Sequence, residues 1–248
     1  MTTPLTAPSL ATPAPSDLLP AVLESVGLAD VFASYASPVG DVLVAWNTRG
    51  ISYLSQSPSF TADFAARVGR PLRGWPDAPP KRVATALDRR LNGKGGPTFA
   101  DLRIVSPFER DVLECTASIP AGEARPYGWV AREIGRPAAV RAVGTALKHN
   151  PVPLLIPCHR VVRSDGRIGE YALGGPGNKR LLLRLEGVPV DELEPVKGFM
   201  GSDTTKIFCL PWCGYGRRVM EVHRRAFRSR DEAEAAGYRA CKHCRPVA

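Results

Sequence analysis

The residue in this sequence best suited to chemistry is a cysteine, Cys158, which His159 follows directly. A thiolate is the reactive form of cysteine, and a neighbouring imidazole can lower the pKa of the thiol or carry its proton away. The pair ends an apolar run with three prolines, NPVPLLIPCHRVV (150–162). Because proline restricts the residue before it to extended backbone, we expect a stiff, extended segment to present this thiol.

The Cys-His pair alone does not prove a nucleophile. Consecutive side chains of an extended segment point to opposite faces, so contact between Cys158 and His159 requires a bend or a bridging water. An isolated Cys-His dipeptide can also be incidental. The residues around the pair must decide between the two interpretations.

Four further cysteines stand near the end of the chain in the spacing C-x3-C, 27 residues, C-x2-C: Cys209, Cys213, Cys241 and Cys244. Four thiolates can complete the tetrahedral coordination of a structural zinc ion. The segment 203–248 is short for a core of its own, and bound metal can supply the missing folding energy. The alternatives are disulfides or free thiols, which two close pairs in a chain without a secretory signal do not favour.

The residue pattern of the first half of the chain predicts a small α+β domain over residues 18–105. No candidate catalytic or metal-binding residues stand out in it. β-branched and aromatic residues alternate with polar ones and break at SPVGD and NTRG, which is typical of an antiparallel meander. The expected strands are 31–37, 41–47 and 51–55, with a further strand in TFADLRIV (98–105) and helices over 60–70 and 79–92.

The chain then becomes helical. Ser106, Pro107 and Glu109 form a capping box with proline at the first helical position, and Cys115 falls on the apolar face, where a core role is expected. Pro126 can start the next helix, Gly135 can end it, and Pro137 can start another.

The last two of these helices could form a helix-turn-helix. The second has a buried stripe of Val140, Val143 and Leu147 and places other residues outward: Arg141, Thr145 and Lys148. Small and basic residues on the outer face suit a DNA-reading helix, although any amphipathic helix pair gives a similar pattern.

The net charge of +9 is concentrated in two segments, +4 over residues 106–188 and +5 over 203–248. Such an imbalance favours an anionic partner, with nucleic acid as the first candidate, although a solvated basic surface would look the same. No apolar run approaches the length of a membrane span, and residues 1–17 read as a disordered tail. We expect a cytoplasmic, monomeric protein with no membrane partner.

Several motifs in order show a family resemblance. RAVGTALKHNPVPLLIPCHRVVRSDGRIGEYALGG, followed by KRLLLRLEG, resembles the O6-alkylguanine-DNA alkyltransferases over about residues 106–188. The resemblance implies DNA repair by irreversible transfer of an alkyl group from O6 of guanine in double-stranded DNA to Cys158. It also implies an α+β fold with an antiparallel-sheet amino-terminal domain and a helical catalytic domain.

The resemblance also implies the roles of individual residues. His159 would accept the thiol proton through a water and Glu186 would orient it, while Asn150 would tie the recognition helix to the acceptor segment. Arg141 would fill the space left by the flipped base, and by the helix pattern Thr145 and Lys148 share its outer face and are expected to face the DNA. The residues implied for the base pocket are Tyr127, which would also donate to the purine, Val161, through its carbonyl, and Tyr171.

The four-cysteine segment resembles the metal-binding module of the Ada response protein. In that module the first cysteine, here Cys209, is both a zinc ligand and a methyl acceptor, which leaves a structural or a methyl-accepting role open. We expect a linker over 189–202 and the zinc module over 203–248. The alternatives to repair at Cys158 are a non-catalytic lesion binder and a methyl-sensing regulator acting through Cys209.

Overall fold

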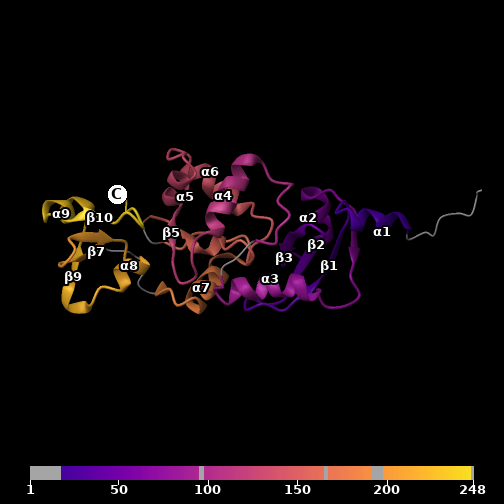
Figure 1. Ribbon diagram of the computed structural model, residues 1–248, viewed down its shortest axis with the longest axis horizontal. Coiled ribbons are helices and arrows are strands. Elements are labelled where there is room, and N and C mark those ends of the chain that lie inside the picture. Colours follow the sequence, from indigo (N-terminus) through magenta and orange to yellow (C-terminus); the bar gives the residue numbers. More distant parts are fainter. Residues whose placement is uncertain (1–17, 95–97, 165–166, 191–197, 247–248) are drawn as a thin grey trace, which may run out of the picture.

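The computed structural model describes residues 18–94, 98–164, 167–190 and 198–246. Three regions follow one another along the long axis in chain order, from the N-terminal sheet through a helical middle to a second small sheet (Figure 1). The expected tail, 1–17, lies outside the described residues. The fold is α+β, as predicted.

The N-terminal sheet has four strands in the order β3-β2-β1-β4. The predicted meander is confirmed as antiparallel β1 (Asp30–Tyr35), β2 (Val42–Asn47) and β3 (Gly50–Ser55); β4 (Leu72–Gly74) adds a parallel edge. Helices α1 (Leu18–Ser25), α2 (Phe60–Arg67) and α3 (Lys81–Leu91) complete the region, and the last two match the expected helices.

The strand predicted over 98–105 is wrong. The segment makes only an isolated bridge between Ala100 and Ile51 and then turns. The buried carboxylate of Asp101 accepts hydrogen bonds from Asn47 and from the side chain and backbone of Arg103. These local bonds hold the chain in a turn in place of a sheet ladder.

The middle region is built on helices α4 (Pro107–Ala117), α5 (Tyr127–Glu133), α6 (Val140–Lys148) and α7 (Gly175–Leu185). The capping box at Ser106 and Glu109 is present. Cys115 is half-buried against the main core, and burial raises its pKa to about 11. Short β5 (Arg125–Pro126) pairs in parallel with β6 (Val161–Val162).

Helices α5 and α6 form the helix pair that the sequence predicted, with two corrections. Helix α6 begins at Val140 and not at Pro137, because residues 136–139 form a separate turn closed by a bond from the amide of Ala139 to the carbonyl of Arg136. Val140 is therefore at the first position of the helix and is 40% exposed, outside the buried stripe that Val143 and Leu147 do form.

The segment before Cys158 is not extended, which corrects another expectation. Pro153 and Ile156 face each other across an isolated bridge, and Leu154 between them has a φ of 73°. A leucine in the left-handed region is uncommon and persists only where the surrounding packing holds it. The chain therefore folds back tightly and delivers the thiol into a single 3-10 turn, η1 (Cys158–Arg160).

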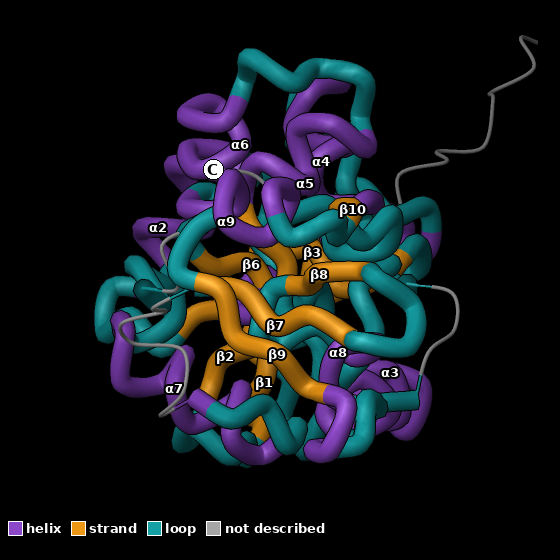
Figure 2. Tube along the Cα trace, turned by 90° about the vertical axis from the view of Figure 1, so that its left-hand side faces the viewer, coloured by secondary structure: helices purple, strands orange, loops and turns teal. Residues whose placement is uncertain are grey.

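The C-terminal sheet has the order β10-β8-β7-β9. It contains β7 (Phe199–Ser202), β8 (Ile207–Cys209), β9 (Arg224–Phe227) and β10 (Arg239–Ala240), with α8 (Gly214–Arg217), η3 (Glu221–His223) and α9 (Arg230–Ala235) between them. Figure 2 views the molecule from the end where this sheet faces the reader.

The linker expected over 189–202 is too long at its C-terminal end. Residues 199–202 are β7, an inner strand paired on one side with β8 and on the other with β9. Val190 is buried against the cysteine cluster, and residues 191–197 lie outside the described part. The four-cysteine module is therefore taken below as residues 198–246.

Within the described residues, no helix is both long enough and apolar enough to cross a membrane.

Candidate active site and metal centre

Cys158 lies at the edge of a cavity of about 590 Å³ in the middle region. The cavity is lined by residues of α5, η1, α6 and the loop before α7: Tyr127, Gly144, Leu147, Lys148, Cys158, Glu170, Tyr171 and Ala172. The thiol-bearing residue is 4% exposed, so the cavity is its route to the outside. A site of this size can accept a planar base, because small-molecule sites span roughly 300–1,000 Å³.

The side-chain amide of Asn150 donates a hydrogen bond to the thiol. Its Nδ2 lies 3.2 Å from Cys158 Sγ and 3.0 Å from the carbonyl oxygen of Ile156, while its Oδ1 accepts from the amide of Val152 at 3.0 Å. The amide thus ties the end of α6 to the acceptor turn. Burial raises the pKa of the Cys158 thiol, and the Asn150 bond and the charge of Lys179 oppose that rise.

His159 is held on its far side by Glu186. His159 Nε2 and Glu186 Oε1 are 3.0 Å apart, and both side chains are buried. Burial lowers the pKa of His159 despite the opposing effect of Glu186. The imidazole is therefore neutral at pH 7, with its Nε2 hydrogen donated to the carboxylate. Its other nitrogen, Nδ1, has no hydrogen-bond partner among the described residues.

Glu186 also pairs with Arg160, a residue whose role the sequence did not reveal. Arg160 Nε and Nη2 reach the carboxylate at 2.9 and 2.7 Å, and Nη1 donates to the carbonyl of Ile119 at 2.6 Å. Burial alone would raise the pKa of Glu186, but the bonds from His159 and Arg160 outweigh it and lower the pKa to about 2. A permanent carboxylate therefore orients the imidazole.

Of the three residues expected in the base pocket, two line the cavity. Tyr127 and Tyr171 form part of its wall, and the ring of Tyr171 meets that of His159 edge-on with centroids 6.1 Å apart. Burial, and then the proximity of Cys158, raises the pKa of Tyr127 to about 12, so its hydroxyl keeps its proton. The side chain of Val161 is fully buried in β6 and is not among the lining residues.

Lys179 is the second residue that sequence reasoning missed. It lies on α7, only 1% exposed, with its Nζ 3.3 Å from the carbonyl oxygen of Glu170 and 5.8 Å from the ring centroid of Tyr127. Burial lowers its pKa to about 8, whereas Cys158 favours its charged form. An inward lysine in a polar helix has no periodicity that would distinguish it from a surface one.

The expected DNA-facing residues lie together on one side of α6. Arg141, Thr145 and Lys148 are all exposed, and Lys148 also reaches the cavity rim. Gly144, between them, brings the backbone of α6 close to Tyr127: a Cβ there would lie 3.9 Å from the tyrosine ring. Because Gly144 and Lys148 also line the cavity, this face of α6 adjoins the cavity mouth.

The four C-terminal cysteines converge. Their sulfur atoms all lie within 4.8 Å of one another, and all four residues are buried. The amide of Leu210 donates to Cys244 Sγ at 3.4 Å. Four buried thiols at this separation match the tetrahedral sulfur set of a structural zinc site, in which Zn–S distances are about 2.3 Å. The residues present fit zinc.

Comparisons with known proteins agree with these two sites. The family model of the 6-O-methylguanine DNA methyltransferase DNA binding domain matches residues 107–188, and that of the metal binding domain of Ada matches 197–247. The second match begins next to β7, in line with the corrected boundary. The zinc site is structural, as the sequence predicted.

Curated relatives match part of the chain. A methylated-DNA–protein-cysteine methyltransferase of Methanosarcina acetivorans is 31% identical over 167 residues, which are 63% of this chain and 97% of that protein. The mouse protein of the same name is 50% identical over 86 residues, 34% of this chain and 41% of its own length.

Solved structures give the same result. A Mycobacterium tuberculosis OGT crystallised with DNA has a TM-score of 0.51 at 30% identity and matches 66% of this chain and 98% of its own. An O6-methylguanine-DNA methyltransferase from Pyrococcus kodakaraensis gives 0.52 at 26% identity, over 64% and 99%. On this evidence the chain belongs to the methylated-DNA–protein-cysteine methyltransferase family and carries an Ada-like metal-binding segment at its C-terminal end.

Proposed function

We propose that this protein repairs DNA by moving an alkyl group from O6 of guanine to the sulfur of Cys158, once per molecule. The observation that carries the proposal is the position of this thiol in a base-sized cavity, with a hydrogen-bond donor below it and a His-Glu pair beside it. A thiolate attacks the alkyl carbon in line, the S–C bond forms as the C–O6 bond breaks, and the thioether is stable.

The proton of the thiol leaves through His159. Its unpartnered Nδ1 accepts the proton by way of a water. Meanwhile Nε2–H keeps donating its hydrogen bond to the carboxylate of Glu186, and this carboxylate stabilises the imidazolium that forms. Asn150 and Lys179 both stabilise the charged thiolate over the neutral thiol, and the His159–Glu186 pair takes up its proton. Together these groups offset the free-energy cost of a charged sulfur at a buried site.

Guanine leaves with an extra electron pair, which one proton must neutralise. Tyr127 lies in the cavity wall with its proton retained, so its hydroxyl is the donor to the purine ring nitrogen. Tyr171 also lines the cavity. We assign reading of the exocyclic amine to the backbone carbonyl of Val161, because β6 continues directly from the acceptor turn.

The target atom lies inside the base stack, so the nucleotide must be extruded into the cavity. The exposed face of α6 suits this step. Arg141 would occupy the space left in the duplex, and Thr145 and Lys148 would contact the backbone beside the cavity mouth. We further propose that the protein acts as a monomer in the cytoplasm.

We propose that residues 18–105, which contain the N-terminal sheet, and residues 106–188, which contain the catalytic site, form separate domains. We also propose that the four cysteines of the C-terminal region hold zinc. Neither alternative from the sequence is favoured. A non-catalytic lesion binder has no need of a thiol in the cavity, and regulation through Cys209 has no support beyond the Ada-like match.

The test is a substitution of the acceptor with a matched cysteine as control. Cys158→Ala should abolish transfer of a radiolabelled methyl group from an O6-methylguanine duplex and leave duplex binding intact. Cys115→Ala removes a half-buried thiol that lies outside the cavity lining and should transfer normally. Transfer that persists in Cys158→Ala contradicts the proposal.

A further inference from the structure

The four-cysteine module is joined to the middle region through an arginine, Arg217. Its guanidinium donates to two backbone carbonyls of the middle region, from Nη1 to Gly187 at 2.9 Å and from Nη2 to Gly122. Arg217 ends the single turn of α8, whose N-cap residue is Cys213, and its own amide bonds the carbonyl of Cys213 at 2.9 Å. The arginine is therefore fixed to a zinc ligand through one helical turn.

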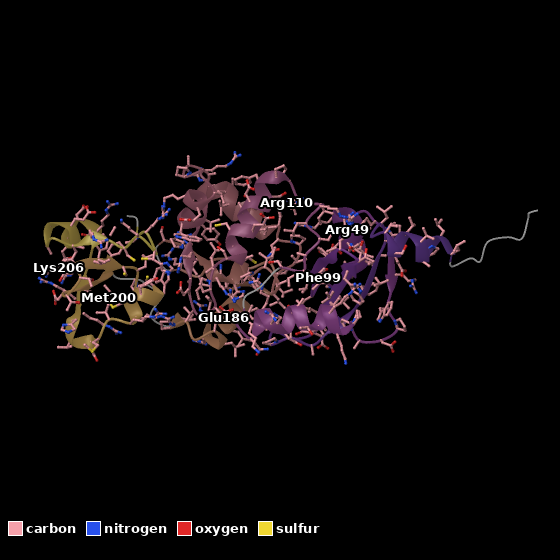
Figure 3. All side chains as sticks on the ribbon, in the orientation of Figure 1. Arg49, Phe99, Arg110, Glu186, Met200 and Lys206 are labelled. Carbon is pink, nitrogen blue, oxygen red and sulfur yellow. The ribbon has the colours of Figure 1, made fainter. Side chains whose placement is uncertain are left out.

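The two carbonyls that Arg217 holds belong to residues that adjoin Glu186 in the chain or lie against it in space. Gly187 is the next residue along the chain, where α7 ends. Gly122 has a φ of +75°, and a Cβ there would come within 2.9 Å of the carbonyl oxygen of Glu186. The loop at Gly122 thus lies directly on the backbone of Glu186, and Arg217 clamps this loop to the residue that follows the glutamate. Figure 3 shows Glu186 in the middle region and Met200 in the neighbouring module.

The rest of the interface keeps α8 from moving independently. Leu210 and Trp212 and all four cysteines share one apolar cluster with middle-region residues, among them Val162, Leu183 and Val188. At the other end of the interface, Trp129 Nε1 donates to the carbonyl of His243 at 3.1 Å, and Glu133 pairs with Arg245 at 2.6 Å. The module and the catalytic region thus share an apolar cluster of their own, separate from the main core around Cys158.

We propose that Arg217 is a positioning residue for alkyl transfer: the folded, metal-holding four-cysteine site fixes α8, α8 fixes Arg217, and Arg217 fixes the backbone at Glu186 so that its carboxylate meets His159. This assignment rests on the proposed function, because it gives the module a role in the same reaction. Small displacements of an orienting group matter, since the His-Glu contact is a single 3.0 Å hydrogen bond.

The experiment compares four forms of the full-length, zinc-loaded protein. Arg217→Ala removes both bonds, and Arg217→Lys keeps the charge without the planar fork that reaches two carbonyls. Glu133→Gln breaks an ion pair of the same interface that involves neither Arg217 nor Glu186, and Arg230→Ala breaks the Arg230–Glu234 pair inside the module. For each form the zinc content, thermal midpoint, duplex affinity and single-turnover transfer rate at saturating DNA are measured.

We expect Arg217→Ala to keep one zinc per chain and its duplex affinity but to transfer roughly tenfold more slowly, as loss of an outer orienting contact commonly does. Arg217→Lys should fall between it and the wild type, and both controls should stay within twofold of the wild type. In nitrogen-15 NMR spectra, the His159 Nε2–H signal should broaden by exchange with water in Arg217→Ala and, equally, after zinc is chelated from the wild type.

An Arg217→Ala rate within twofold of wild type, with an unchanged His159 signal, overturns the proposal. So does an equal loss of rate in Glu133→Gln, because then the whole interface and not the clamp matters. Should Arg217→Ala fail to fold, the same criteria apply to Arg217→Lys. Failure of the proposed function is a separate result: it appears as wild-type transfer that does not depend on Cys158.

Discussion

Cys158 and the four clustered cysteines are similarly buried, yet the protein meets the charge of their sulfur atoms in different ways. At Cys158 the groups that favour a thiolate belong to the chain itself, the amide of Asn150 and the ammonium of Lys179. At the cluster, four sulfur atoms within 4.8 Å of one another repel when ionised, and a metal cation is what offsets their charge.

The difference explains why one thiol can react and the others hold the fold. Cys158 faces a cavity, and conversion of its sulfur to a thioether removes a charge without releasing a bound metal. Each clustered cysteine supplies one of four ligands, so its loss releases a metal on which the module depends. Exposure alone does not separate the two kinds of cysteine, whereas their partners do.

The largest effect should come from removing zinc. Chelation should unfold much of the module, because the metal holds the four cysteines together and the module's own apolar cluster is small, made of Phe208, Phe227, Ala233 and Tyr238. Hydrogen exchange measured by mass spectrometry should show lost protection over 198–246 and retained protection in β1–β3. Full protection in a protein shown to be metal-free would remove the distinction between the two sites.

Next is the loss of the orienting carboxylate. Glu186→Gln should slow transfer by about 100-fold, since the imidazolium loses its counter-charge. It leaves the buried Arg160 without a carboxylate and should destabilise the fold by about 3–5 kcal/mol, whereas Glu234→Gln, at an exposed pair, should cost at most about 1 kcal/mol. Chemical denaturation and single-turnover kinetics measure the two quantities.

The same carboxylate predicts a pH dependence of stability. The pKa of Glu186 is about 2 in the folded protein and 4.5 in its ordinary state. Its contribution is therefore fully present above about pH 4.5 and is lost as pH falls towards 2. In Glu186→Gln this part of the acid loss should disappear from the unfolding free energy measured against pH. An unchanged acid limb contradicts the assigned pairing.

A smaller effect is expected from removing the side-chain amide of Asn150, which donates to the thiol. Asn150→Ala removes the bond to Sγ and leaves the buried amide of Val152 unpaired, at about 1–3 kcal/mol, while the carbonyl of Ile156 keeps its bond from the amide of Cys158. Because the bond to Asn150 lowers the pKa of the thiol, the transfer rate should fall about tenfold at pH 7 and recover at higher pH. A rate profile that does not move with pH would separate Asn150 from thiolate formation.

The smallest effect concerns DNA. Lys148→Ala removes one exposed charge at the cavity rim and should reduce the slope of log affinity against log salt by about one, with little change in the rate at saturating duplex. Fluorescence anisotropy titrations over a range of salt concentrations measure the slope. An unchanged slope would place the duplex away from this end of α6.

Much of this arrangement could be predicted from local sequence patterns. Alternation gave β1–β3, the capping box gave the start of α4, and cysteine spacing gave the metal cluster. These features depend on residues close in sequence or on few possible partners. The residues of the acceptor site came from ordered motifs, and the structure brings Cys158, Asn150, His159 and Glu186 together.

The rest depends on contacts that no local pattern reveals. Leu154 adopts a left-handed conformation because the packing around it holds it there, so the three prolines suggested extension where a tight turn exists. Arg160 and Lys179 look like surface residues until their helices are packed. Val140 fits an apolar stripe by spacing but falls at a helix end, where the stripe no longer faces the core.

The central claim is that the sulfur of Cys158, and not one of the clustered sulfur atoms, takes the alkyl group from guanine. Peptide-mapped mass spectrometry of the zinc-loaded protein after incubation with excess O6-methylguanine duplex tests it directly. The account predicts a gain of one methylene in mass per molecule, confined to the peptide that contains Cys158. A gain at Cys209, or an unmodified Cys158 peptide after the lesion has been consumed, would contradict it.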